Sequence, residues 1–244
     1  MRIHPGNLSH SLKWTKTSYF FLSSFILLIS LIGYIWWPLL KEYLNQFNPQ
    51  VSIWRQLDWL LIGNFLFMTL LIMAGADIKK DWIIILVGLF GGLAIESWGT
   101  QTWLWSYYTH ERPPLWIIPA WPIASLSIDR LFRVLIFPVR RVSDTIFRIS
   151  YWITFPIFYL LMLRFVFPTI TKSFTLMSLI LTGYIILTPV NYRSMVLTFL
   201  SGTVLGYFLE LWGTTRLCWT YYTLETPPLF AVLAHGMAAV VFLR

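Results

Sequence analysis

The chain has 244 residues, of which 57% are hydrophobic and only 11% are charged, whereas soluble domains carry about 25% charged residues. This composition excludes an ordinary soluble domain and predicts a polytopic membrane protein, because a bilayer solvates apolar surface that a single soluble core could not hide. The net charge of +8 does not indicate nucleic-acid binding, because the basic residues are dispersed between the apolar runs.

The apolar runs predict an all-α membrane bundle of about eight transmembrane helices. Each run is close to the roughly 17–25 residues that a crossing requires. The fourth and eighth runs are short and hold proline or glycine, so a broken or re-entrant segment is the alternative there. The predicted spans are 18–39, 57–76, 82–100, 114–128, 150–169, 173–190, 195–212 and 228–243.

The distribution of lysine and arginine predicts how the chain is oriented in a plasma or inner membrane. One side holds 12 of these residues and the other holds 6, so the positive-inside rule places both termini in the cytoplasm. The connection 129–149 carries five arginines among apolar residues at roughly helical spacing. This pattern predicts either an amphipathic helix on an anionic leaflet or an ordinary basic loop.

Shifted by 114 residues, the chain matches itself without gaps. Between 88–115 and 202–229, 14 of 28 positions are identical, which indicates a tandem duplication. The predicted organisation is a first half at 1–128, a basic connector at 129–149 and a second half at 150–244. Because four crossings separate the copies, both halves should share one orientation. Both copies of the motif are then expected on the outer side.

Each copy of the repeat places one glutamate inside the apolar layer. Glu96 lies about 14 residues into its predicted span, roughly 21 Å from the inner end at 1.5 Å per residue, and Glu210 has the same depth in the second half. A carboxylate at such depth is costly, by roughly 2.5–3.5 kcal/mol near the bilayer centre, and normally faces a cavity or a partner. The preceding G-x-x-x-G pairs favour close helix packing on the same face, so both glutamates should face the bundle interior.

These features define the candidate site. The candidate catalytic residues are Glu96, Glu210 and His235, with the two glutamates as acid and base in either order. His235 stands where the first half has Trp121, so the copies differ there. The candidate substrate-binding residues are Trp98, Thr100, Trp105, Tyr107, Tyr108, Trp121, Trp212, Thr214, Trp219, Tyr221 and Tyr222.

The same residues also permit a structural reading. Paired glutamates can cross-link helices through hydrogen bonds, interfacial rings commonly form belts, and a lone histidine in a span is often a packing residue. No histidine spacing typical of a metal site, no nucleotide-binding fingerprint and only one cysteine, Cys218, are present. We therefore expect no cofactor and no metal.

The segment 96–121 resembles the membrane protein family of carotenoid biosynthesis that includes carotenoid hydratases, and more weakly the small membrane lycopene cyclases. The resemblance implies a membrane enzyme whose substrate is an isoprenoid, with lyase or isomerase chemistry. Trp103 replaces the glycine that follows the threonine in the hydratase motif, and the Pro-x-Glu-Glu of the cyclases is missing after Pro119. The matching residues are Glu96, Gly99, Thr102, Trp105, Tyr107, Tyr108, Pro119 and Trp121.

Three functional hypotheses follow. The leading one is an enzyme that hydrates, cyclises or isomerises a double bond of an isoprenoid, carotenoid or other lipid, with ring faces stabilising a carbocation. The second is a transporter or lipid-binding module without catalysis. The third is a membrane scaffold without chemistry. The expected partners are the bilayer and a lipid or isoprenoid substrate, and no nucleic acid is expected.

Overall fold

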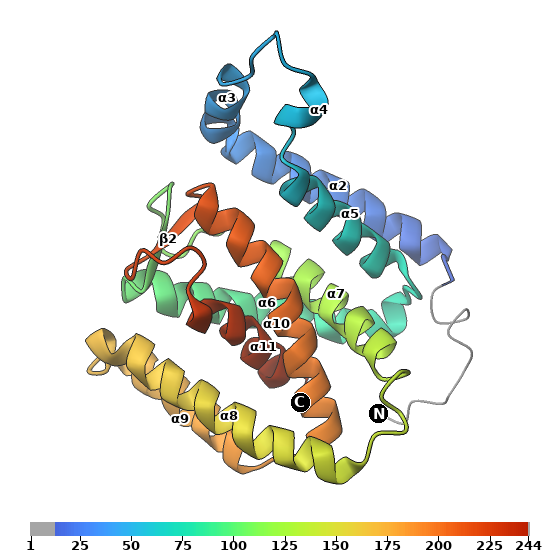
Figure 1. Ribbon diagram of the computed structural model, residues 1–244, viewed down its shortest axis with the longest axis vertical. Helices are drawn as coiled ribbons and strands as arrows, with labels where there is room; N and C mark the ends of the chain where they lie inside the picture. The colour runs from blue at the N-terminus through green and yellow to red at the C-terminus, as the bar shows by residue number, and fades with distance from the viewer. Residues whose placement is uncertain (1–12, 244) are drawn as a thin grey trace. The chain divides into compact units, whose positions relative to one another are not determined.

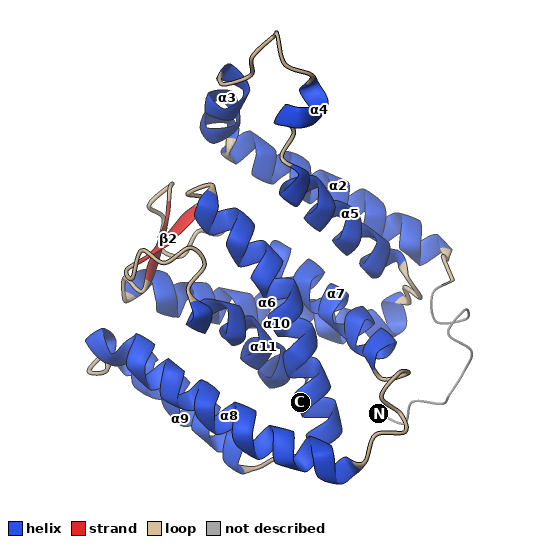
Figure 2. Cartoon of the chain, viewed as in Figure 1, coloured by secondary structure: helices blue, strands red, loops and turns tan. Residues whose placement is uncertain are grey.

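The computed structural model describes residues 13–243, and helices form most of that part of the chain (Figures 1 and 2). The chain divides into two compact units, Met1–Asp81 and Trp82–Arg244. The candidate site lies entirely in the second unit.

The first unit is an antiparallel pair of helices, α2 (Lys16–Ile35) and α5 (Trp59–Met73), joined through α3 (Trp37–Asn45) and α4 (Ile53–Gln56). A capping box begins α2, because the Thr15 side chain accepts from the Ser18 amide while the Ser18 hydroxyl accepts from the Thr15 amide. The Ser18 hydroxyl also donates to the Met73 carbonyl at 2.6 Å, so the start of α2 meets the end of α5.

The second unit holds the longer helices and one small sheet. Its elements are α6 (Ile78–Gln101, whose first four residues belong to the first unit), β1 (Trp105–Tyr107), α7 (Ala120–Leu135), α8 (Asp144–Val166), η1 (Phe167–Thr169), α9 (Ser173–Leu187), α10 (Tyr192–Thr215), β2 (Trp219–Tyr221) and α11 (Leu229–Leu243).

Two contacts fix the directions of these helices. The strands pair antiparallel with Trp105 opposite Tyr221 (Figure 2), and each strand follows its helix by a few residues, so α6 and α10 end at the same edge of the unit. At the other edge, Arg193 in the first turn of α10 pairs with Asp144 in the first turn of α8 at 2.8 Å. Helices α8 and α10 therefore start together, and α9 must return the chain between them.

Within residues 13–243, four helices are long and apolar enough to cross a membrane: Lys16–Ile35, Ile78–Gln101, Asp144–Thr169 and Tyr192–Thr215. About eight crossings were predicted, and four of them correspond to helices of sufficient length and apolar character. The apolar helices at 59–73, 173–187 and 229–243 have 15 residues each. They are shorter than the predicted spans for local reasons. For example, α9 stops at Leu187 because Pro189 disfavours a helical conformation at the residue before it.

The predicted fourth span, 114–128, is wrong in its bounds. Residues 114–119 form turns, and α7 begins only at Ala120 and continues to Leu135. The helix continues through charged residues because Asp129 accepts from Arg130 at 2.5 Å and from Arg133 at 2.8 Å, with Asp129 and Arg130 buried. The predicted boundary at 128 therefore lies inside a helix.

The segment 129–149 is not one amphipathic surface helix. It comprises the second half of α7, a series of turns, and the beginning of α8, where the Ser143 side chain accepts from the Thr145 amide. The apolar residues that suggested helical spacing are divided among the end of α7, these turns and the start of α8.

Candidate functional site

The carboxylate of Glu96 is buried, with 3% of the residue exposed, and it is held by three donors. Trp105 Nε1 donates to Oε2 at 3.0 Å, while Tyr107 Oη and Trp121 Nε1 donate to Oε1 at 2.8 and 3.1 Å. These donors come from β1 and α7, so one side chain of α6 joins three successive elements.

The carboxylate of Glu210 has the same environment 114 residues later. It is 4% exposed and accepts from Trp219 Nε1 at 2.9 Å and from Tyr221 Oη at 2.8 Å. The third partner is His235 Nε2 on α11, at 2.9 Å from Oε1. Every partner of one glutamate thus has its counterpart at the other.

The backbone conformation between each glutamate and the following strand explains how the aromatic rings of the strand reach the carboxylate. Trp103 and Leu217 adopt φ values of 62° and 55°, which ends each helix in the left-handed conformation typical of a C-terminal cap. The chain then reverses into the strand, where residues two apart point to the same side. Trp105 and Tyr107 therefore both face Glu96. A Cβ at Gly99 would overlap the Trp105 ring, so glycine is needed for this approach.

We call the three partners of each carboxylate its cage: Trp105, Tyr107 and Trp121 for Glu96, and Trp219, Tyr221 and His235 for Glu210. Aromatic contacts bring the two cages against each other. Trp105 lies 5.8 Å from Tyr221 and Tyr107 lies 5.9 Å from Trp219, measured between ring centroids. On the other side of the carboxylates the rings of Trp121 and His235 are nearly parallel, with 17° between planes and 5.9 Å between centroids. The prediction that both glutamates face one shared interior agrees with these contacts.

The two tyrosines of the cages are neutral hydrogen-bond donors. Burial raises the pKa of Tyr107 well above 10, and the adjacent charge of Glu96 raises it further. Burial and the charge of Glu210 act in the same way on the pKa of Tyr221. Both hydroxyls therefore keep their protons at neutral pH.

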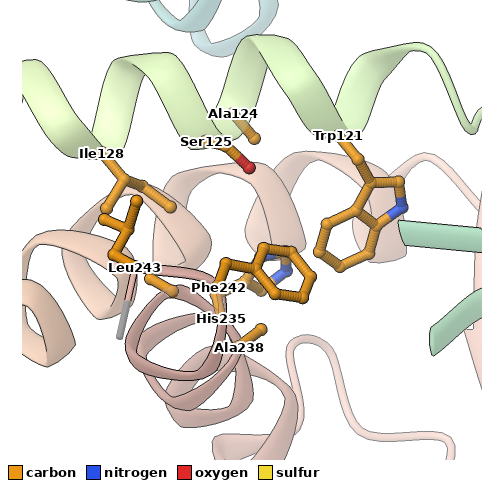
Figure 3. A pocket seen from close by; sticks show the side chains of 9 residues that line it. Trp121, Ala124, Ser125, Ile128, His235, Ala238, Phe242 and Leu243 are labelled. Carbon is orange, nitrogen blue, oxygen red and sulfur yellow. The ribbon is translucent and has the colours of Figure 1, made fainter. Parts of the chain in front are cut away.

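A small cavity lies beside His235, between α7 and α11 (Figure 3). Its volume is about 10 Å³, close to the space that one water molecule requires. Figure 3 shows Trp121 and Ser125 from one helix directed towards His235 and Phe242 of the other. The cavity is mostly apolar, and the Ser125 hydroxyl and the imidazole are the polar groups of its lining.

The two threonines predicted to bind substrate are turned to the backbone instead. The hydroxyl of Thr100 donates to the Glu96 carbonyl at 2.6 Å, and that of Thr214 donates to the Glu210 carbonyl at 2.6 Å. Both residues are buried. They therefore stabilise the end of each helix rather than contact the carboxylates.

Trp98 and Trp212 pack edge-on against the cage tryptophans, Trp105 and Trp219 respectively. Trp98 Nε1 also donates to Thr175 Oγ1 on α9 at 3.1 Å. These two rings form an outer layer behind the cages.

Tyr108 and Tyr222 follow the inward tyrosines by one residue and are therefore directed away from the carboxylates. Tyr222 Oη donates to the Phe165 carbonyl at 2.7 Å, and its ring is 42% exposed. Neither tyrosine therefore belongs to the set of side chains that bind Glu96 and Glu210.

Sequence reasoning missed Ser125 and Phe242 as neighbours of His235. Ser125 lies one turn beyond Trp121 on α7, and the same helical spacing places Phe242 two turns beyond His235 on α11. This helical spacing was the signal in the sequence from which both neighbours could have been predicted. Among the described residues, no group of three or more His, Cys, Asp or Glu side chains is arranged to hold a metal ion.

Comparison with protein-family models, with curated proteins and with solved structures found no match to this chain. The resemblance of 96–121 to the carotenoid-biosynthesis family therefore stays a prediction. Any functional conclusion depends on the geometry of the site.

Proposed function

We propose that the protein is a membrane enzyme that performs acid–base chemistry at a double bond of an isoprenoid or other lipid. The observation that carries the proposal is the pairing of His235 with Glu210 at 2.9 Å inside an aromatic, apolar surrounding. General acid–base catalysis needs a group that releases and recovers a proton near neutral pH, and imidazole is the side chain best suited to this.

The proposal gives the two halves different roles. The indole of Trp121 donates a hydrogen bond to Glu96 but has no proton to exchange near neutral pH. The proposal therefore assigns Glu96, together with the surrounding ring faces, to the stabilisation of a cationic intermediate. The Glu210–His235 pair is the acid and base.

The proposed reaction conserves atoms and charge without a cofactor. The protonated pair adds its proton to one alkene carbon, which leaves a carbocation on the other. In hydration, water then adds to the cation and returns one proton to the pair. In isomerisation or cyclisation, a proton lost from another carbon returns to the pair instead. Because the cavity beside His235 holds about one water, a lipid chain can enter only when side chains such as Phe242 move.

The architecture that we propose for this enzyme is a parallel duplication of four plus four crossings. The opposed directions of successive helices in the second unit support it, as does the α2–α5 hairpin in the first. The shorter apolar helices would then cross with the help of their flanking turns. Both termini would be cytoplasmic, with β1 and β2 on the outer side.

The proposal is tested by comparing lipid extracts of cells that produce the wild type, Glu210→Gln, His235→Gln or Glu96→Gln. Mass spectrometry should show a lipid altered by the wild type, either by gain of one water or without change of mass. Because acid–base catalysis contributes roughly 10²–10⁴-fold, Glu210→Gln and His235→Gln should each lower product at least 100-fold.

The matched controls are Glu111→Gln and Glu225→Gln, which change exposed glutamates of the two copies outside the cages and should keep full product. Full turnover in both Glu210→Gln and His235→Gln would disprove the acid–base assignment. One observation favours a purely structural role for the site, namely that each carboxylate ties three elements together. That role predicts loss of folded protein in parallel with any loss of product, which size-exclusion chromatography of the purified variants measures.

A further inference from the structure

The first turn of α10 holds the loop before α8 in a fixed shape. The guanidinium of Arg193 pairs with the Asp144 carboxylate at 2.8 Å and lies 4.7 Å from the centroid of the Phe147 ring. It also donates to three backbone carbonyls of the loop, those of Val139 and Arg140 at 3.2 Å and of Val142 at 2.6 Å. The planar guanidinium of one arginine thus binds four residues of the segment 139–144.

This arrangement leaves a cluster of cations without a counterion. Arg140, Arg141 and Arg148 are exposed, and in the described chain no ion pair involves any of the three. The one acidic residue of the loop region, Asp144, is already bound to Arg193. The loop, through Arg140 and Arg141, and the start of α8, through Arg148, therefore present three guanidinium groups on a fixed backbone.

The depth of these groups follows from the helices that start here. The candidate span Asp144–Thr169 has 26 residues, which at 1.5 Å per residue is about 39 Å, longer than the ~30 Å hydrocarbon core. Its first turn therefore extends into the headgroup layer. The next exposed side chains along α8, Ile149 and Ile153, are apolar, as expected for residues in contact with the hydrocarbon core.

We propose that the loop 139–143 and the first turn of α8 form a binding surface for the phosphate groups of anionic phospholipids. Guanidinium groups match phosphate oxygens in a bidentate geometry, and the bilayer itself supplies the ligand at this depth. Each basic residue close to an anionic leaflet contributes roughly a factor of five in lipid association. The surface is separate from the glutamate cages and does not depend on the proposed reaction.

The test uses the full-length protein in proteoliposomes that contain trace spin-labelled phosphatidylglycerol or spin-labelled phosphatidylcholine. Electron paramagnetic resonance measures the fraction of each lipid immobilised at the protein. The wild type should select phosphatidylglycerol several-fold over phosphatidylcholine, and Arg140→Gln/Arg141→Gln/Arg148→Gln should lose most of that selectivity. Millimolar inorganic phosphate should not compete if the lipid headgroup is the ligand.

The matched control is Arg112→Gln/Arg164→Gln/Lys172→Gln, which removes three exposed cations at the opposite ends of the helices and should keep the selectivity. Equal selectivity in the wild type and the first triple variant would overturn the proposal, as would an equal loss in the control. Product formation by the Glu210–His235 pair should be unchanged in both, so failure of one proposal is distinguishable from failure of the other.

Arg193 is a positioning residue in this proposal, and its variant Arg193→Lys separates shape from charge. Lysine keeps the positive charge but cannot reach the three carbonyls and Asp144 together. Selectivity for phosphatidylglycerol should therefore fall at constant net charge, while circular dichroism shows the helices intact. Unchanged selectivity in Arg193→Lys would contradict the role of the fixed loop.

Discussion

At the scale of single residues, Glu96 and Glu210 differ in one partner only. Two partners, a tryptophan and a tyrosine, are the same in both cages, whereas the third is Trp121 in the first and His235 in the second. Indole and imidazole occupy the same position and both lie in hydrogen-bond reach of Oε1. The indole N–H only donates a hydrogen bond, whereas imidazole can donate or accept one, so the second cage has a group that the first cage lacks.

The tyrosine hydroxyls predict how stability depends on pH. Their pKa is raised in the folded protein, whereas an unfolded tyrosine ionises near pH 10. Their contribution is therefore fully present below about pH 10 and is lost as the pH rises above it. Tyr107→Phe/Tyr221→Phe lacks these groups, so the stability gap between wild type and double variant should narrow above about pH 10. Thermal unfolding in detergent between pH 8 and 11 measures it, and a constant gap would contradict the assignment.

At the scale of elements, glycines set how closely paired helices approach. A Cβ at Gly92 of α6 would overlap the Trp121 ring of α7, and a Cβ at Gly206 of α10 would overlap the His235 side chain of α11. These glycines lie one helical turn before Glu96 and Glu210. They therefore allow the third partner of each carboxylate to reach it.

Gly92→Ala and Gly206→Ala should each destabilise the protein by about 1–3 kcal/mol, because overpacking forces the helices apart. The matched controls are Gly33→Ala and Gly63→Ala, at helical glycines whose added Cβ meets no atom within 4 Å. These controls should leave stability unchanged or raise it by up to about 1 kcal/mol, since alanine favours helix. Thermal unfolding of the four variants in one detergent compares them, and equal losses in all four would refute the packing argument.

At the scale of the whole molecule, the sequence repeat and the helix directions determine which loops lie at the same edge of the second unit. Strands β1 and β2 pair with each other, so the loops that carry Glu111 and Glu225 lie at the same edge of the second unit. The starts of α8 and α10 meet at the opposite edge, where Arg140 lies.

Labelling of single cysteines checks this topology in a Cys218→Ala background. Glu111→Cys and Glu225→Cys should both react with a membrane-impermeant maleimide on intact cells. Under the proposed topology, in which the side with more basic residues faces the cytoplasm, Arg140→Cys should react only after permeabilisation. Reaction of Glu111→Cys and Glu225→Cys from different sides would rule out the parallel arrangement.

The sequence predicted the parts of the site that depend on local spacing. The depth of Glu96 and Glu210 in their helices, and the glycines on the same face, indicated that both carboxylates point inward. The shift of 114 residues pairs Trp121 with His235 from the sequence alone. It did not predict that these two residues complete the cages, because hydrogen bonds between α6 and α7, or between α10 and α11, depend on how those helices pack.

The amino-acid sequence by itself determined the long apolar helices, the repeated motif and the inward direction of the glutamates, because composition and periodicity are local properties. Only the tertiary structure decided the bounds of α7, the clamp that Arg193 forms on the loop before α8, and the contact between the two aromatic cages. Those features join residues far apart in the chain, and no local pattern records which partner a buried donor will find. The physical reason is that a buried polar group must satisfy its hydrogen bonds with whatever the packed fold places beside it.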